Sequence, residues 1–323
     1  MTGSWSGSPA TSVAAPTDRS IPAHRPYSVL FARLLLGVLA GYVVLAGLAW
    51  LFQERLAFPA PRASLPDPVR AGLPDVEPLS LVMKDGTSLA GWYLPAVPGG
   101  GRGKRVTALL WFYGNGENIG AIWPVLRDFR PPGAALLVVD YPGYGASGGR
   151  ASEDGLYEAA DLAFQALVAR PEVDRARVFV YGRSLGSAAA THLASTHSVA
   201  GLILESPFTS AHEMSRRHYA LFPAFIVRLR LDNLAALRRV RCPVLVFHGT
   251  ADRLVPPEMG RRVAAAAGPS ELVLIEGAGH NDTYELGGRA YRDKLWEFIK
   301  SPSPAPAGPG LPQAGARRRR ARG

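Results

Sequence analysis

A chain of 323 residues is long enough for one large α/β domain or two smaller ones, and it can bury a sizeable core. The formal net charge is +10, but much of it comes from the arginines after residue 316, in a segment (301–323) whose composition predicts a disordered basic tail. The body of the chain is only mildly basic, so nucleic-acid binding has little support. Cys242 is the single cysteine, which excludes an intrachain disulfide and a cysteine-based metal cluster.

The N-terminal region joins a polar segment to a long apolar run. Residues 1–28 are rich in Ser, Thr, Pro, Gly and Ala, a composition typical of disorder. Residues 29–52 are apolar apart from Arg33 and are long enough to cross a bilayer as a helix, with Trp50 suited to an interface. A cleaved signal peptide and a buried core helix are the alternatives. The length of the run, its distance from the N-terminus and its apolar character on every face favour a single-pass signal anchor.

The charges on either side of this run bear on its orientation. Arg19, Arg25 and Arg33 lie before it or at its start, and Glu54 and Arg55 follow it. Because positive charge is retained on the cytoplasmic side, this distribution predicts a cytoplasmic N-terminus. The rest of the chain is then expected to be extracytoplasmic.

After the apolar run the chain changes character twice. Residues 53–78 are rich in proline and are expected to form a semi-stiff tether. Residues 79–300 then alternate extended runs with helical patterns, beginning with a hairpin predicted at Asp85-Gly86. Near-continuous apolar stretches at 106–113 and 134–140 are typical of strands buried on both faces. This alternation predicts an α/β fold with a mostly parallel, doubly wound sheet.

One serine lies in a strand–turn–helix context. The run Val178–Tyr181 is followed by the pattern G-x-S-x-G around Ser184, and then by a helix of small residues. Such a turn is so sharp that side chains two positions before and after the serine would collide with neighbouring backbone. We therefore expect Ser184 to be a nucleophile, with the first N–H groups of the helix pointing at a developing oxyanion. A structural turn is the alternative.

Two more predicted strands end on the acid and the base that a serine nucleophile needs. Asp252 and His280 each follow a strand, so they should share one edge of the sheet with the serine. Glu205, at the end of another strand, is the rival acid. Asp252 could instead cap the helix that begins near Pro256, and His280 could be a solvated loop histidine. His248 is expected to be structural, beneath Asp252.

An oxyanion hole requires two N–H donors. Leu185, directly after the serine, is expected to supply one, and Asn115 or Gly114, in the loop of small residues after the strand at 106–113, the other. A phosphate cradle is the alternative for this loop, but the P-loop pattern and a dinucleotide fingerprint are missing here. No metal-ligand spacing is found, so neither a cofactor nor a metal is expected. Asp140 is expected to organise its own turn rather than to act in catalysis.

Six ordered motifs together resemble the α/β-hydrolase superfamily and, more narrowly, its Bem46-like, ABHD13/ABHD17-type membrane-anchored serine hydrolases. The motifs are Phe112–Asn118, Asp140–Gly145, Gly182–Gly186, Leu204–Phe208, His248–Asp252 and Gly279–Asp282. The resemblance covers about residues 50–300 and implies Ser184 as nucleophile, Asp252 as acid and His280 as base. The family usually has histidine where this chain has Tyr113, so the hydrogen bonds within that loop are expected to differ, while a backbone oxyanion donor is retained.

The longest insertion, about 206–241, is expected to form a small helical cap over the site. Its apolar residues and arginines are Tyr219, Leu221, Phe222, Phe225, Ile226 and Leu229, and Arg216, Arg217, Arg228 and Arg230. They fit an acyl-binding lid near the membrane or a core-packing helix pair. The sequence therefore predicts a membrane-anchored serine hydrolase that cleaves carboxylic esters or thioesters, including lipid-like ones, through an acyl-enzyme. Acyl transfer by the same residues, or a tethered binding protein with this fold, are the alternatives.

Overall fold

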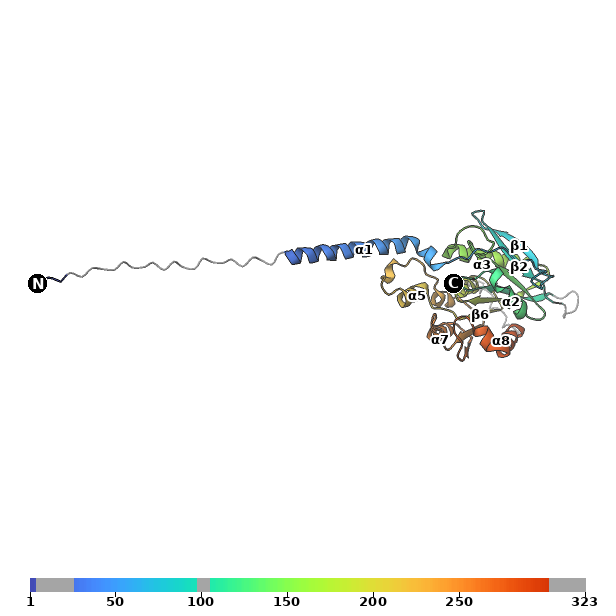
Figure 1. Cartoon of the computed structure of the whole chain (residues 1–323). Coiled ribbons are helices and arrows are strands. Elements are labelled where there is room, and N and C mark those ends of the chain that lie inside the picture. Colours follow the sequence, from blue (N-terminus) through green and yellow to red (C-terminus); the bar gives the residue numbers. More distant parts are fainter. Residues whose placement is uncertain (4–25, 98–104, 302–323) are drawn as a thin grey trace, which may run out of the picture. The chain divides into compact units, whose positions relative to one another are not determined.

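The computed structural model describes residues 1–3, 26–97 and 105–301, and Figure 1 shows their helices and strands. The predicted disordered segments at the two ends therefore lie largely outside the described residues. The chain divides into two units, Met1–Leu48 and Ala49–Gly323. The elements in chain order are α1 (Pro26–Ala57), β1 (Glu77–Val82), β2 (Ser88–Leu94), β3 (Val106–Phe112), α2 (Ile119–Phe129), β4 (Ala134–Val139), α3 (Glu153–Val168), β5 (Val173–Arg183), α4 (Leu185–Thr196), β6 (Gly201–Glu205), α5 (Ala211–His218), the 3-10 turn η1 (Ala224–Ile226), α6 (Asn233–Leu237), β7 (Val244–Gly249), α7 (Pro257–Ala266), β8 (Ser270–Ile275) and α8 (Thr283–Lys300).

The helix α1 is apolar along most of its length. It is longer than the predicted run at 29–52, because Gln53, Glu54 and Arg55 continue the helix. Among the described residues it is the one helix long and apolar enough to cross a membrane, and its most apolar window is not buried. It is therefore a candidate transmembrane helix.

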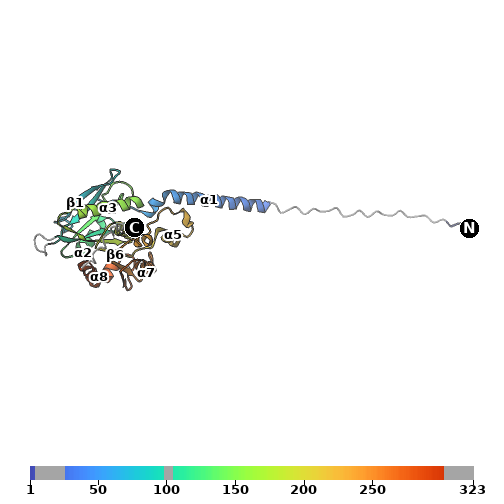
Figure 2. The same cartoon turned by 180° about the vertical axis from the view of Figure 1, so that it is seen from behind.

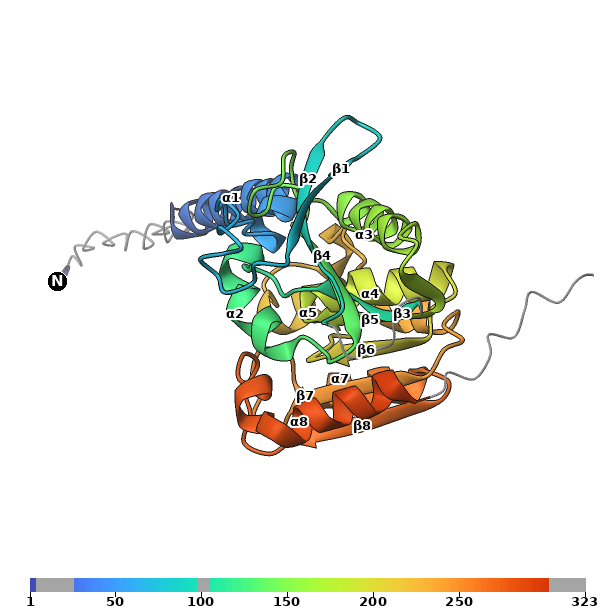
Figure 3. The same cartoon turned by 90° about the vertical axis from the view of Figure 1, so that its right-hand side faces the viewer.

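The described strands form a single sheet in the order β1-β2-β4-β3-β5-β6-β7-β8. The strand β2 runs antiparallel to both of its neighbours, and the pairs from β4 to β8 are parallel. Figure 3 shows the sheet from the projecting β1–β2 hairpin to β8. The predicted hairpin at Asp85-Gly86 joins β1 to β2, and Asp85 Oδ1 accepts a hydrogen bond from the Thr87 N–H at 2.8 Å. The predicted α/β fold with a mostly parallel sheet is confirmed.

Helices cover both faces of the sheet, as its buried strands require. The helices α3, α4, α6 and α7 follow one another along one face. The helices α2 and α8 lie on the other, where the Phe129 ring is 5.6 Å from Tyr284 and 6.1 Å from Tyr291. Figure 2 shows the same arrangement from behind. The strand β4 is buried along its whole length and β3 along all but its first residues, as their apolar sequences predicted.

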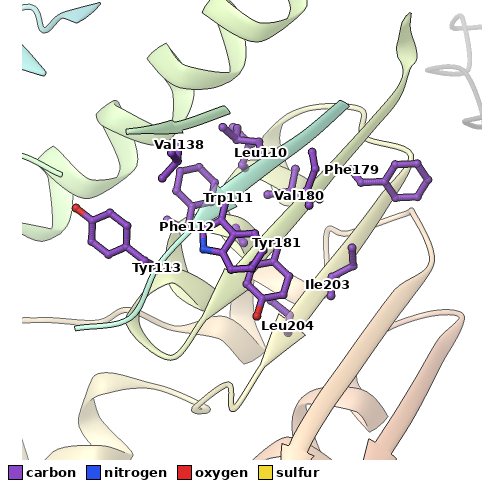
Figure 4. Packing of buried hydrophobic residues seen from close by; sticks show 14 of the residues in the cluster. Leu110, Trp111, Phe112, Tyr113, Val138, Phe179, Val180, Tyr181, Ile203 and Leu204 are labelled. Carbon is purple, nitrogen blue, oxygen red and sulfur yellow. The ribbon is translucent and has the colours of Figure 1, made fainter. Parts of the chain in front are cut away.

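The central strands carry the core. Trp111 of β3 stacks on Tyr181 of β5 with ring centroids 3.9 Å apart, and Phe129 packs against both rings. Figure 4 shows Trp111 and Tyr181 beside Val138 of β4 and Ile203 and Leu204 of β6. Truncating a buried aromatic side chain costs about 3–5 kcal/mol. The strands that end at the site are therefore anchored in a tightly packed interior.

The predicted tether at 53–78 is not a separate linker, and this expectation is corrected. The helix α1 takes up its first residues, and Phe58, Leu73 and Val76 are buried in the same apolar cluster as the sheet. Arg62 donates hydrogen bonds to carbonyls of the loop after β4. A few apolar side chains between the prolines are enough to bind the segment to the domain.

The insertion predicted as a cap contains α5, η1 and α6. Within this insertion, Leu229 and Leu231 are buried, whereas Tyr219, Leu221 and Phe225 are exposed. The expectation of a helix pair packed into the core is therefore wrong for the part of the insertion that contains these exposed residues.

Candidate active site

Ser184 occupies a sharp turn between β5 and α4. Its φ of 48° lies in the left-handed region, which residues other than glycine rarely adopt. The turn is held in place by the Ser184 N–H, which donates to the Glu205 carbonyl at 2.9 Å. A Cβ atom at Gly182 or Gly186 would overlap neighbouring backbone. The two glycines are therefore required by the close packing of the turn, for the reason predicted from the sequence.

The side chains of Ser184, His280 and Asp252 form one hydrogen-bonded chain. His280 Nε2 lies 2.9 Å from Ser184 Oγ, and His280 Nδ1 lies 2.7 Å from Asp252 Oδ2. A proton on Nδ1 directed at the carboxylate leaves the Nε2 lone pair facing the serine hydroxyl, which is the tautomer that a general base needs. The structure thus brings the three predicted residues together, from the loops after β5, β7 and β8.

Asp252 is buried and surrounded by hydrogen-bond donors. Burial acts to raise its pKa, but hydrogen bonds from His248, His280 and the Val255 N–H hold the pKa well below its usual range. Its Oδ1 accepts from the backbone N–H groups of Leu254 and Val255 at 3.0 and 2.8 Å. The carboxylate is therefore an anion at neutral pH, as an acid that orients an imidazole must be.

His248 is fully buried next to this loop. Its Nε2 lies 2.8 Å from the Val255 carbonyl and 3.4 Å from Asp252 Oδ2. Because no part of the ring is exposed, His248 supports the loop that carries the acid. This is the structural position that the sequence predicted for it.

Glu205, the rival acid, lies in a separate buried cluster. Its carboxylate accepts hydrogen bonds from the hydroxyls of Tyr181, Tyr291 and Thr283. Burial raises the pKa of Glu205 to about 7, although the Thr283 and Tyr291 hydrogen bonds act to lower it. Among the described residues, the carboxylate that the His280 ring contacts belongs to Asp252.

The candidates for the oxyanion hole lie at the start of α4 and on the loop after β3. Leu185 is the first residue of α4. The Gly114 N–H donates to Glu117 Oε2 at 2.7 Å and is engaged within its own loop. The Asn115 side chain donates to the Ala57 carbonyl at 2.7 Å and accepts from a tyrosine hydroxyl at 2.6 Å, which fixes the loop at this residue. This geometry favours the backbone of Asn115 over that of Gly114 as the second donor.

Tyr113 supports the same loop. Its hydroxyl donates to Asp140 Oδ1 at 3.1 Å and accepts from the Tyr141 N–H at 3.0 Å. Asp140 also accepts from the backbone N–H groups of Ile119 and Ala146. Asp140 therefore organises its own turn, as predicted, and it also holds the loop after β3 through the Tyr113 hydroxyl and the Ile119 N–H.

Two residues that the sequence reasoning missed join the loops of the site. Arg183 forms an ion pair with Glu117 on the loop after β3, and it donates to the His280 carbonyl at 3.2 Å and to Asn281 Oδ1 at 2.8 Å. Glu117 in turn accepts from the Gly114 N–H. The sequence feature that could have identified Arg183 is its position directly before the serine of G-x-S-x-G. Its partners lie 66 and 97 residues away, so no local pattern identifies them.

A small apolar hollow lies beside the start of α4. It is too shallow to hold a ligand in this structure, and its walls include Phe58, Tyr141, Pro142, Tyr144, Leu156 and Leu185. Within the part of the chain that the structure describes, no cluster of three or more His, Cys, Asp or Glu side chains could hold a metal ion.

Known proteins match this chain over most of its length. Residues 103–237 match the family model described as serine aminopeptidase, S33, and residues 230–308 match the one described as TAP-like protein. The uncharacterized protein Rv2307c of Mycobacterium tuberculosis is 37% identical over 259 residues, which is 77% of this chain and 88% of that protein. The alpha/beta hydrolase domain-containing protein WAV2 of Arabidopsis thaliana is 30% identical over 82% of this chain and 93% of its own.

Solved structures share the architecture at lower identity. The Pyrococcus furiosus esterase Pf2001 has a TM-score of 0.59 and 17% identity, covering 75% of this chain and 98% of its own. The acetyl xylan esterase from Paenibacillus sp. R4 has a TM-score of 0.58 and 20% identity, covering 70% of this chain and 84% of its own. At these identities the likeness shows the fold. Together with the curated relatives it establishes that the chain belongs to the α/β-hydrolase superfamily.

Proposed function

We propose that the protein is a membrane-anchored serine hydrolase that cleaves carboxylic esters or thioesters. The observation that carries the proposal is the hydrogen-bonded chain from Ser184 through His280 to Asp252, with the serine in a strained turn at φ 48°. An ionised acid, an imidazole within hydrogen-bond distance of both the acid and the serine, and a partly exposed serine in a strained turn have no shared structural purpose outside covalent catalysis. Family membership makes hydrolysis the expected reaction class.

The geometry supports a two-step reaction. His280 Nε2 takes the Ser184 hydroxyl proton as Oγ attacks the carbonyl carbon, and the Leu185 and Asn115 N–H groups stabilise the oxyanion that forms. The imidazolium then gives its proton to the departing alcohol or thiol, which leaves an acyl-enzyme on Ser184. A water molecule, deprotonated by His280, attacks this ester, and the collapse releases the acid and restores the serine.

Labelling with a fluorophosphonate probe tests this proposal directly. We expect the detergent-solubilised protein to be labelled, and Ser184→Ala and His280→Ala to lose the label together with esterase activity. Ser195→Ala is the matched control, because Ser195 lies in the same helix α4, donates to the His192 carbonyl and accepts from Arg239, and so contacts neither His280 nor Asp252. If Ser184→Ala kept full activity, the proposal would fail.

A substrate panel separates the remaining alternatives. Esters and thioesters of graded chain length are compared with aminoacyl amides, since one matching family model is described as an aminopeptidase. Product analysis with and without added alcohols distinguishes hydrolysis from acyl transfer. A well-folded protein that neither labels nor turns over any substrate would be a tethered binding protein with this fold.

We also propose that α1 anchors the protein and leaves the hydrolase domain outside the cytoplasm. The apolar length of Tyr27–Ala57 supports anchoring, and the arginines before the span support the orientation. We expect the protein to stay in the membrane fraction at alkaline pH. In a Cys242→Ala background, a membrane-impermeant thiol reagent added to intact cells should label Leu286→Cys, whose side chain is 58% exposed. Labelling only after lysis would reverse the orientation.

A further inference from the structure

The outer part of the cap exposes apolar side chains that a water-facing surface does not explain. In the segment 219–230, here called the cap loop, Phe225 is 86% exposed, Leu221 66% and Tyr219 59%. Adjacent large apolar groups of this kind mark a contact surface on a soluble domain. The inner residue Leu229 is buried, so the cap loop is attached to the domain on one side and presents its apolar groups on the other.

The cap loop is bound to the residues in which α1 ends. The Gln53 Oε1 accepts from the Arg228 N–H at 2.7 Å and from the Leu229 N–H at 3.3 Å, and Arg228 also donates to the Trp50 carbonyl at 3.4 Å. The Arg228 guanidinium lies 4.7 Å from the centre of the Trp50 ring. Trp50 and Gln53 belong to the same compact unit as the hydrolase fold. The cap loop is therefore attached to Trp50, a residue type that is enriched at membrane–water interfaces.

The arginines around the cap loop are compatible with contact to lipid headgroups, but nearby carboxylates reduce the net positive charge. Arg216, Arg217, Arg228 and Arg230 are exposed, and arginine side chains can lay their stems on apolar surface while the guanidinium reaches the headgroups. Arg228 and Arg230 share a hollow of about 310 Å³ with Glu54, Glu153 and Asp154, which offset part of their charge. The apolar side chains must therefore provide most of the contact.

We propose that the cap loop is a membrane-contacting surface, which inserts Phe225, Leu221 and Tyr219 into the headgroup region of the bilayer that α1 spans. The proposal rests on the membrane anchoring proposed above. It gives the protein a second contact with lipid, formed by the hydrolase domain itself. The cap also contacts the loop that carries the acid, because His218 Nε2 lies 2.8 Å from the Leu254 carbonyl. The candidate site is thereby held beside the bilayer surface, where esters with long acyl chains reside.

Fluorescence of the full chain in lipid nanodiscs tests this contact. In a Cys242→Ala background, an environment-sensitive fluorophore is attached to Phe225→Cys, and nitroxide lipids serve as quenchers. Leu286→Cys on α8 is the matched control, as another exposed apolar position of the same domain. Leu39→Cys, in the middle of α1, reports the span. We expect blue-shifted emission and quenching by shallow nitroxides at position 225, deep quenching at 39, and neither at 286.

Each other outcome overturns the proposal in a distinguishable way. If position 39 is quenched while 225 behaves like 286, the span stands and the cap contact is refuted. If position 39 is not quenched, the anchoring fails and the cap contact fails with it. A label at 225 that is shielded only when two copies share a disc would assign the surface to self-association instead.

Kinetics give a second readout that depends on the hydrolase proposal. Phe225→Ser should lower the rate on an ester embedded in vesicles about tenfold, because a buried phenylalanine contributes strongly to partitioning into an apolar phase. The rate on a short, water-soluble ester should be unchanged, and Leu286→Ser should alter neither. Equal loss on both substrates would contradict membrane contact. No turnover of either substrate would refute the hydrolase function, while the fluorescence result would remain valid.

Discussion

Two buried carboxylates lie at neighbouring strand ends of this molecule, and they are held in opposite ways. Asp252, after β7, receives two backbone N–H groups and two imidazoles, and its pKa is lowered despite its burial. Glu205, at the end of β6, receives three hydroxyl groups and has Arg183 Nε 3.5 Å from its Oε1, and burial raises its pKa to about 7. Burial is nearly complete at both positions.

The hydrogen-bond donors around the two carboxylates differ in kind, and this contributes to the opposite shifts of their pKa values. Backbone N–H groups and a histidine that becomes cationic stabilise the anion, whereas neutral hydroxyls only partly replace the lost water. A carboxylate that is half protonated at neutral pH is a poor partner for an imidazolium. The surroundings of Asp252 therefore suit the catalytic acid, and those of Glu205 suit a structural one.

The largest expected effect is that of Asp252→Asn. An amide keeps the shape of the side chain but favours the wrong histidine tautomer, so kcat on a soluble ester should fall by about 10⁴-fold, as in the serine-protease example from which this magnitude comes. Glu205→Gln should lower kcat far less. Steady-state kinetics of the two purified variants decide between the carboxylates. A larger loss for Glu205→Gln would reverse the assignment of the acid.

The second expected effect is on the pH dependence of stability, to which Glu205 makes a contribution that can be measured separately. Its pKa rises from 4.5 in the unfolded chain to about 7 in the folded protein, so the folded state binds the proton more tightly. The resulting stabilisation is fully present below pH 4.5 and is lost as pH rises through 7, a loss of about 2 kcal/mol between pH 5 and 8. Glu205→Gln cannot ionise and should remove this part of the pH dependence.

Thermal unfolding in detergent at a series of pH values measures this difference. Between pH 5 and 8 the Tm of the wild type should fall about 5 °C more than that of Glu205→Gln. Glu172→Gln, an exposed carboxylate whose pKa is lowered, is the control and should not flatten the profile. Parallel Tm profiles for the wild type and Glu205→Gln would show that Glu205 is ionised throughout.

Much of this arrangement could be predicted from the sequence, because strand ends are encoded locally. The apolar runs before Ser184, Asp252 and His280 mark where three strands stop, and parallel strands stop at a common edge. The helix α3 begins directly after Ser152, a residue type favoured at N-caps, and the Ser152 hydroxyl accepts from the Gly155 N–H. Each of these inferences needs only neighbours in the chain.

The parts that could not be predicted depend on partners far apart in the sequence. Whether Glu205 or Asp252 meets His280 depends on which loops are adjacent, and both follow apolar strands. The buried Phe58 lies in a proline-rich segment whose composition indicated a linker. The outer cap has the apolar content of a core helix, yet the structure leaves Phe225 exposed. Composition records how apolar a segment is and not what covers it.

The smallest expected effect joins the two carboxylate regions through Arg183. Its Nε lies 3.5 Å from Glu205 Oε1, and its Nη2 donates to the His280 carbonyl, so one cation contacts both loops. We expect Arg183→Met to lower kcat about tenfold with little change in KM, below the roughly 100-fold loss that a displacement of about 1 Å can cause. Arg183→Lys should recover part of kcat, because it restores the charge but not the planar fork. A rise in KM at constant kcat would instead show that Arg183 binds substrate rather than positioning the base.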